Sequence, residues 1–257
     1  MPKLTEANMD NFTGGHFSFS GTKIVELEKV ASQFTLATIV VDDTGSVSGF
    51  KDLIEAALKE SVRSLQLSPR ADNMLVRVTT FSSCSNKGVH EIHGFKLLSE
   101  INTDDYNGIL SCGGMTPLRD ATIDGLDSIR HYAQSCGNNN FETNGILIVL
   151  TDGDDNASKL GIGAVASAKS SCVTEEALES ILSILVGINV QNTGLAYYLE
   201  GYKNDGKFDQ FVKLEDASQK TLARLGGFIS KSISSSSQAL GTGGASAPVN
   251  FNGSLAI

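Results

Sequence analysis

The order of apolar and polar positions follows two different periods along the chain. Residues 34–42, FTLATIVVD, form a continuous and largely β-branched run, which is typical of a strand covered on both faces. Directly afterwards, apolar residues recur at helical spacing from Phe50 to Leu65 and predict an amphipathic helix. Comparable apolar runs predict further strands over residues 73–81, 145–153, 182–190 and 208–214.

Helix signals separate these strands. In TPLRDATIDGLDSIRHYAQ, Pro117 lies just inside the predicted helix start, with Thr116 as its cap. Residues 174–181 predict a short helix, 216–233 a terminal helix, and 90–101 an edge strand that runs into a turn. This alternation predicts an α/β fold: a doubly wound, Rossmann-like, mostly parallel sheet with helices on both faces and one antiparallel edge strand.

Composition divides the chain into three predicted parts. Residues 1–29 are an N-terminal extension, and residues 30–235 hold the alternating strands and helices of one domain. Residues 236–257 are rich in Ser, Gly and Ala, which is typical of a flexible extension.

Net charge, the first residues and the cysteines limit the classes of partner and the cellular location that we expect. A net charge of −9 argues against nucleic acid or an anionic membrane as the main partner, because both attract basic surfaces. The first residues lack the pattern of a signal peptide, and no apolar run reaches the length of a membrane span. The four cysteines are scattered without a Cys-x-x-Cys pair, so we expect reduced thiols and a cytoplasmic protein.

Three motifs carry the candidate chemistry. In VVDDTGSVSG, Asp42, Thr44 and Ser46 stand at alternate positions after the first buried strand. Thr116 follows the glycines of CGGMTPLRDA, and Asp152 follows another buried strand in VLTDGDDN. Because ligands of an open parallel sheet bind at the carboxyl ends of its strands, we expect these five side chains to meet there.

Such a group of side chains would form an all-oxygen shell of modest charge. Mg²⁺ takes about six oxygen ligands, and hydroxyls and carboxylates suit it; Mn²⁺ and Ca²⁺ are the alternatives. The hydroxyls would bind directly, while Asp42 and Asp152 would bind directly or through water. With only two protein carboxylates the ion would remain electron-poor and attract a carboxylate from a partner.

These motifs resemble the von Willebrand factor A (vWA) family and its metal-ion-dependent adhesion site (MIDAS). The matching segments are IVVDDTGSVSGF, GGMTPLRDA and LIVLTDGDDN, in the order and setting of that family, and the resemblance covers about residues 30–235. It implies that Asp42, Thr44 and Ser46 form the first motif, that Thr116 is the threonine-loop ligand, and that Asp152 is the last aspartate.

The chain departs from the family at two positions beside the expected metal. Thr44 stands where serine is usual, which keeps the oxygen and adds a methyl group, and Met115 stands where a third glycine is common. Asp43, Asp154 and Arg119 are candidates for the rim of the site, where a partner would make contact.

Other functions are compatible with single motifs. Asp43-Thr44-Gly45 reads as the catalytic triplet of an aspartic protease, but no second triplet occurs and a helical pattern follows, which leaves only a homodimeric enzyme. A haloacid dehalogenase-like phosphotransferase requires a second carboxylate at position 44, where threonine stands. A Mg²⁺-dependent hydrolase or phosphotransferase would need a cation or histidine facing the metal, and Arg119 is the nearest candidate.

The favoured prediction is a non-enzymatic, metal-dependent protein-interaction module that binds a partner's Asp or Glu. The resemblance implies, for intracellular members, work beside an AAA+ ATPase or in a multi-protein assembly. The remaining alternative is a structural subunit with a stabilising metal site, whose tail wraps a neighbour.

Overall fold

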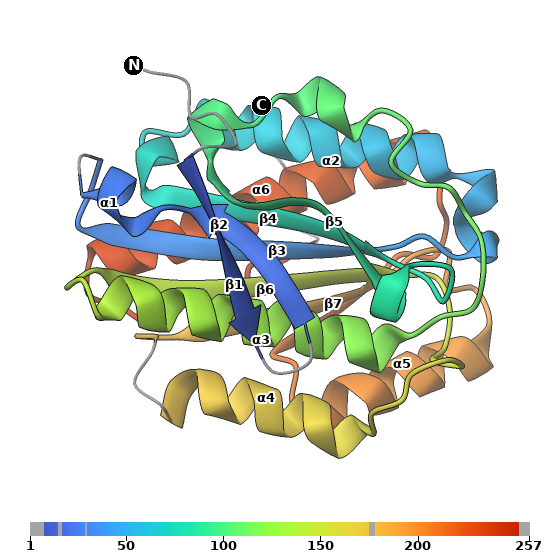
Figure 1. The fold of residues 1–257 in the computed structure, drawn as a ribbon. Coiled ribbons are helices and arrows are strands. Elements are labelled where there is room, and N and C mark those ends of the chain that lie inside the picture. The colour runs from blue at the N-terminus through green and yellow to red at the C-terminus, as the bar shows by residue number, and fades with distance from the viewer. Residues whose placement is uncertain (1–7, 15–16, 29, 175–177, 252–257) are drawn as a thin grey trace.

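The computed structural model describes residues 8–14, 17–28, 30–174 and 178–251. Within them, eight strands form one sheet in the order β1-β2-β5-β4-β3-β6-β7-β8 (Figure 1). The strands are β1 (Met9–Gly14), β2 (Phe17–Thr22), β3 (Gln33–Asp42), β4 (Met74–Phe81), β5 (Val89–Leu97), β6 (Glu142–Thr151), β7 (Ile181–Gly187) and β8 (Gln210–Lys213). The predicted α/β class is confirmed.

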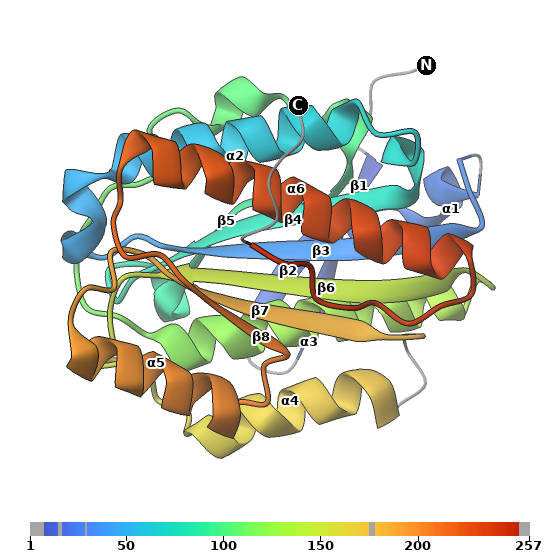
Figure 2. The same cartoon turned by 180° about the vertical axis from the view of Figure 1, so that it is seen from behind.

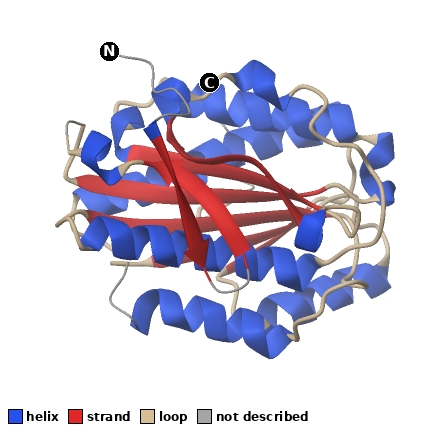
Figure 3. Ribbon diagram, viewed as in Figure 1, coloured by secondary structure: helices blue, strands red, loops and turns tan. Residues whose placement is uncertain are grey.

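Helices cover both faces of this sheet (Figures 1 and 3). One face carries α2 (Lys51–Gln66) and α6 (Gln219–Gly241), and the other carries α3 (Leu118–Gly137), α4 (Ile162–Thr174) and α5 (Thr193–Asp205), with the short α1 (Ile24–Leu27) at one end. Alternate residues of β3 supply the two cores: Phe34, Leu36 and Val40 pack toward α3, and Ala37, Ile39 and Val41 toward α2 and α6. The unbroken apolar run of β3 therefore reflects burial on both sides.

The topology indicates that a ligand would bind at the carboxyl ends of the central strands. β3 is flanked by the parallel strands β4 and β6, and β7 and β8 extend the parallel ladder beyond β6. The chain therefore winds first to one side of β3 and later to the other. In such sheets the crevice lies outside the carboxyl ends of the strands where the winding reverses, which here means the ends of β3 and β6.

The predicted edge strand is antiparallel but does not lie at the edge. β5 pairs antiparallel with β4, as expected, and β2 continues the sheet beyond it through the parallel pair Gly21–Phe95. β1 and β2 form an antiparallel hairpin across the α3 side of the sheet (Figure 1). The backbones of β2 and β5 meet so closely that a Cβ on Gly94 would collide with the Ser20 carbonyl. Residues 9–14 and 17–22 of the expected N-terminal extension are therefore strands of this sheet.

Two helices were not predicted, and several predicted boundaries differ from the structure. The missing helices are α4 and α5. Residues 175–177 of the short helix expected over 174–181 lie outside the described residues. The terminal helix continues from the expected end at residue 233 to Gly241. Its serines give no apolar signal, yet Ser236 and Ser237 are buried with Leu240.

The segment after α6 turns back along the helix (Figure 2). The Val249 carbonyl accepts a hydrogen bond from Gln210, and the Phe251 ring packs edge-on against Phe228 at 5.5 Å. Val249 and Phe251 thus attach this segment to the domain, although most of residues 242–251 are exposed, and the Ser/Gly/Ala composition did not predict these contacts. No helix in the described part of the chain combines the length and apolarity needed to cross a bilayer.

Candidate metal centre

Asp42, the last residue of β3, lies at the buried bottom of the site. It is only 1% exposed. The Thr44 amide and hydroxyl donate to Asp42 Oδ1 at 2.9 and 2.6 Å, and Thr151 Oγ1 donates to Oδ2 at 2.7 Å. Thr151 ends β6, beside β3, so the parallel register itself brings this donor to Asp42. Both carboxylate oxygens are therefore held by neutral donors.

From Asp42 a chain of side-chain oxygens crosses to the next strand end. Thr44 Oγ1 lies 3.0 Å from Ser46 Oγ, and Ser46 Oγ donates to Asp152 Oδ1 at 2.6 Å. The 3₁₀ turn Gly45–Gly49, anchored by the fully buried Val47, positions the exposed Ser46 for this contact. Residues 106 positions apart in the sequence thus share one hydrogen bond.

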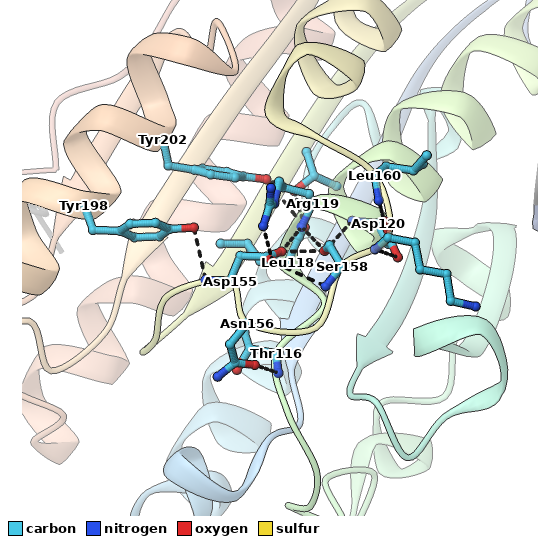
Figure 4. Close-up of polar contacts among 12 residues, drawn as sticks. Thr116, Leu118, Arg119, Asp120, Asp155, Asn156, Ser158, Leu160, Tyr198 and Tyr202 are labelled. Atoms are coloured by element: carbon cyan, nitrogen blue, oxygen red, sulfur yellow. Dashed lines mark hydrogen bonds and ion pairs between the residues drawn. The ribbon is translucent and has the colours of Figure 1, made fainter.

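Thr116 reaches the same place from the loop before α3. Its amide donates to Asn156 Oδ1 at 2.7 Å, and its carbonyl accepts from the Asn156 amide at 3.1 Å (Figure 4). Thr116 Oγ1 lies 3.9 Å from the position that a Cβ on Gly153 would occupy, directly after Asp152. Thr116 is not the predicted helix cap, because Pro117 occupies the N-cap position of α3 without a side-chain cap bond.

Neither acidic side chain of the site has a cationic partner among the described residues. Burial raises the pKa of Asp42 to about 6, although hydrogen bonds from Thr44 and Thr151 oppose the shift. Burial also raises the pKa of Asp152, again against the Ser46 hydrogen bond. The protein thus holds two carboxylates in positions where their negative charge is poorly compensated.

The donor set fits a hard divalent cation. Within the described ranges no group of three or more His, Cys, Asp or Glu side chains could hold a metal, so a site here depends on hydroxyl oxygens as well. Asp42, Thr44, Ser46, Thr116 and Asp152 offer only oxygen, which suits Mg²⁺, Mn²⁺ or Ca²⁺ rather than a metal that prefers sulfur or nitrogen.

The three rim candidates lie in different environments. Asp43 is 4% exposed, and its carboxylate accepts hydrogen bonds from the Cys112 amide at 2.7 Å and the Ser111 hydroxyl at 3.0 Å. It therefore braces the loop that leads to Thr116 instead of facing outward. Asp154 is exposed, as expected of a residue at a rim.

Arg119 forms an ion pair with Asp155. Its Nη2 donates to Asp155 Oδ1 at 2.6 Å, and its amide donates to Oδ2 at 2.8 Å (Figure 4). Burial alone would raise the pKa of Asp155, but the hydrogen bonds from Arg119 and Ser158 outweigh burial and hold it below its usual range. Tyr198 of α5 accepts from the Asp155 amide at 3.1 Å. Arg119 therefore stabilises the loop after β6.

The sequence reasoning missed the residues that position the ligand candidates. Thr151 is the residue before Asp152, and its place opposite Asp42 follows from strand register. Asn156 and Asp155 are part of VLTDGDDN, but their partners lie in another segment, so nothing local distinguishes them from a polar turn.

By sequence, no known protein family and no curated protein matches this chain. Solved structures do share its fold. The open conformation of the pilus adhesin SpaC from Lactobacillus rhamnosus GG superposes with a TM-score of 0.58 at 15% identity, covering 79% of this chain and 30% of SpaC. The D319A mutant of the PilB minor pilin from Streptococcus sanguinis gives a TM-score of 0.57 at 14% identity, covering 83% of this chain and 64% of PilB.

A third similar structure is described with a metal at a MIDAS motif. Proximal thread matrix protein 1 (PTMP1) from the mussel byssus, with a zinc-occupied MIDAS motif, gives a TM-score of 0.54 at 18% identity, covering 79% of this chain and 48% of PTMP1. The chain spans less than a third of SpaC and about half of PTMP1. At these identities the likeness concerns the fold: the chain has the α/β architecture of an adhesin, a minor pilin and a matrix protein.

Proposed function

We propose that the chain is a metal-dependent protein-interaction module of the vWA type, in which a divalent cation at a MIDAS-like site binds a carboxylate of a partner protein. The observation that carries the proposal is the continuous line of oxygens from Asp42 through Thr44 and Ser46 to Asp152, with Thr116 beside Gly153. The fold neighbours support an interaction role, since they are named as adhesin, pilin and matrix protein.

The proposed ligands are Asp42, Thr44, Ser46, Thr116 and Asp152, with Mg²⁺ as the favoured ion. When bound, the cation would offer a coordination position to an Asp or Glu of the partner. The chain's own residues do the rest: Thr151 and the Thr44 amide orient the Asp42 carboxylate, and Asn156 fixes the backbone of Thr116. Such prior orientation lowers the entropy cost of binding.

Among the described residues, no contact supports the enzymatic alternative. A hydrolase or phosphotransferase would require a cation or histidine directed at Asp42 or Asp152, and Arg119, the candidate from sequence, is bound to Asp155. A role as a structural subunit depended on a tail free to wrap a neighbour, whereas Val249 and Phe251 hold the segment after α6 against β8 and α6. We therefore favour recognition over both.

The class of partner follows from charge. A net charge of −9 opposes nucleic acid and anionic membranes, whereas a metal-bound site attracts a single carboxylate. The AAA+ ATPase or multi-protein assembly implied by the family resemblance, and the cytoplasmic location expected from the scattered cysteines, stay predictions. All four cysteines are free thiols in the described structure.

Calorimetric titration of Mg²⁺ or Mn²⁺ into the wild type and two variants tests the site. Asp42→Ala removes a proposed ligand, and Asp154→Ala removes the same charge from the exposed neighbour of Asp152. We expect metal binding to be lost in Asp42→Ala and weakened about twofold or less in Asp154→Ala, because exposed charges act weakly through solvent. Equal binding by wild type and Asp42→Ala would refute the assignment.

A pull-down with and without EDTA then tests the role of the metal in recognition. The interaction module predicts that a partner retained by the wild type in Mg²⁺ is released on chelation and is not retained by Asp42→Ala. A partner that stays bound in both conditions would instead indicate a metal-independent assembly role.

A further inference from the structure

Met115 is a large apolar side chain exposed at the candidate metal centre. It directly precedes Thr116 and is 56% exposed, although most large apolar side chains of the protein are buried. Single exposed apolar residues are common on protein surfaces, so exposure alone carries no function. The backbone around Met115 and the chemistry of its neighbours carry the inference.

The backbone of Met115 is fixed on both sides. Its amide donates to Ser83 Oγ at 2.8 Å, and its carbonyl accepts from the Ser83 amide at 2.9 Å. Gly114 before it has φ +75°, and a Cβ there would lie 2.7–2.8 Å from atoms of Ser82, Ser83 and Cys84. The loop therefore cannot easily turn Met115 inward, and its side chain is presented to solvent from a rigid support.

The other exposed residues of the three loops are small, polar or charged. Gly45 and Ser46 come from the first loop, and Asp154, Asn156 and Lys159 from the last. Arg119, the cation nearest in sequence to Thr116, is paired with Asp155. Among the described residues of the three loops, Met115 is the exposed large apolar side chain, so an apolar residue of the partner would contact Met115, whereas Asp154 would repel a second acidic side chain.

We propose that Met115 determines partner specificity: the residue next to the metal-binding Asp or Glu of the partner is a large apolar side chain, and Met115 contacts it. The inference rests on the proposed function and adds the sequence context of the recognised carboxylate. An unbranched, polarisable Met side chain adapts to aliphatic and aromatic partners alike. Burying such a contact corresponds to a preference of about 3- to 10-fold over a polar neighbour.

Selection from random peptides displayed on phage tests this proposal with the full chain. The wild type, Met115→Ser and Met115→Leu are immobilised in Mg²⁺, and bound phage are released with EDTA. We expect wild type and Met115→Leu to enrich Asp or Glu flanked by Leu, Ile, Phe or Met, and Met115→Ser to enrich the acid alone. Synthetic peptide pairs that carry Leu or Ser beside the Asp then measure the 3- to 10-fold preference.

The outcomes separate the two proposals. Calorimetric Mg²⁺ binding should be the same in all three proteins, because Met115 offers no oxygen ligand. If no acidic peptide is released by EDTA from the wild type, the proposed function fails, and this inference with it. If acidic peptides are enriched but their neighbours are random, or if Met115→Ser keeps the apolar preference, only the role of Met115 is refuted.

Discussion

Two carboxylate clusters of this protein, each with one deeply buried aspartate, differ in whether the described chain supplies a cation to them. In the first, which we call the closed cluster, the 1% exposed Arg77 donates to Glu91 and Asp124, each at 2.8 Å, and to Ser128 at 3.2 Å. Glu91 also accepts from the Ser20 amide and hydroxyl at 2.9 and 2.6 Å, which attaches the β1–β2 hairpin. The chain itself supplies the cation.

The second, the open cluster, consists of Asp42 and Asp152 with the hydroxyls of Thr44, Ser46 and Thr151. Hydroxyls and one amide are its donors, and neither carboxylate forms an ion pair with a described residue. Desolvating a charge is expensive unless a counter-charge repays it. The closed cluster thus contains its own cation, although burial still raises the pKa of Asp124, whereas the proposed function would supply the open cluster with a cation from solution.

The largest effect is expected from breaking the closed cluster. Arg77→Met leaves Glu91 and Asp124 without their guanidinium, and we expect the unfolding free energy to fall by about 3–5 kcal/mol, measured by urea denaturation. Arg119→Met is the matched control, because it removes a 29% exposed guanidinium from Asp155. Its cost should be clearly smaller, and equal losses in the two variants would contradict the distinction drawn for the closed cluster.

The stability of the open cluster should fall as pH rises, because its buried carboxylate has no cationic partner among the described residues. In EDTA-treated protein, the Asp42 pKa of about 6 lies above its unfolded value of 3.8, so the folded state holds this proton more tightly. Its contribution to stability is therefore complete below about pH 4 and is lost as pH rises toward 6. Asp42→Asn removes the charge, and we expect its unfolding free energy to decline less than that of the wild type over this range.

Denaturation curves at several pH values, with and without Mg²⁺, check this expectation. At pH 7, Mg²⁺ should stabilise the wild type but not Asp42→Asn, because a ligand that binds only the folded state adds to its stability. Asp154→Asn, at an exposed position, should follow the wild type. Parallel pH profiles for wild type and Asp42→Asn would show that the pKa of Asp42 is not raised in the folded protein.

The smallest effect concerns a positioning residue of the open cluster. Asn156→Ala removes the acceptor for the Thr116 amide, and we expect Mg²⁺ affinity to fall about 3- to 10-fold, corresponding to roughly 1 kcal/mol for one hydrogen bond. Asn139→Ala is the control, since it removes one exposed hydrogen bond at the far end of α3. Calorimetry that finds equal metal affinity in both variants would assign Asn156 a purely structural role.

Sequence reasoning predicted the parts of the fold with strong local periodicity. The long runs of β3 and β6 and the amphipathic α2 were expected close to their observed bounds. α4 was missed because its face toward the core offers few large apolar residues: Val165 and Cys172 are buried, and Ile162, Ala164 and Ala168 pack beside them. The β1–β2 hairpin was missed because short alternating strands beside polar turns look like an extension.

The sequence by itself determined the residue types of the candidate site and their positions after buried strands, since the strand period and the helix signals are local properties of the chain. It could not decide which acidic residues find a cation within the protein. Asp155 forms an ion pair with Arg119, and Asp124 forms one with Arg77. Asp42 and Asp152 accept hydrogen bonds from neutral donors instead. Tertiary structure decided that difference, because the register of β3 against β6 brings together groups more than a hundred positions apart.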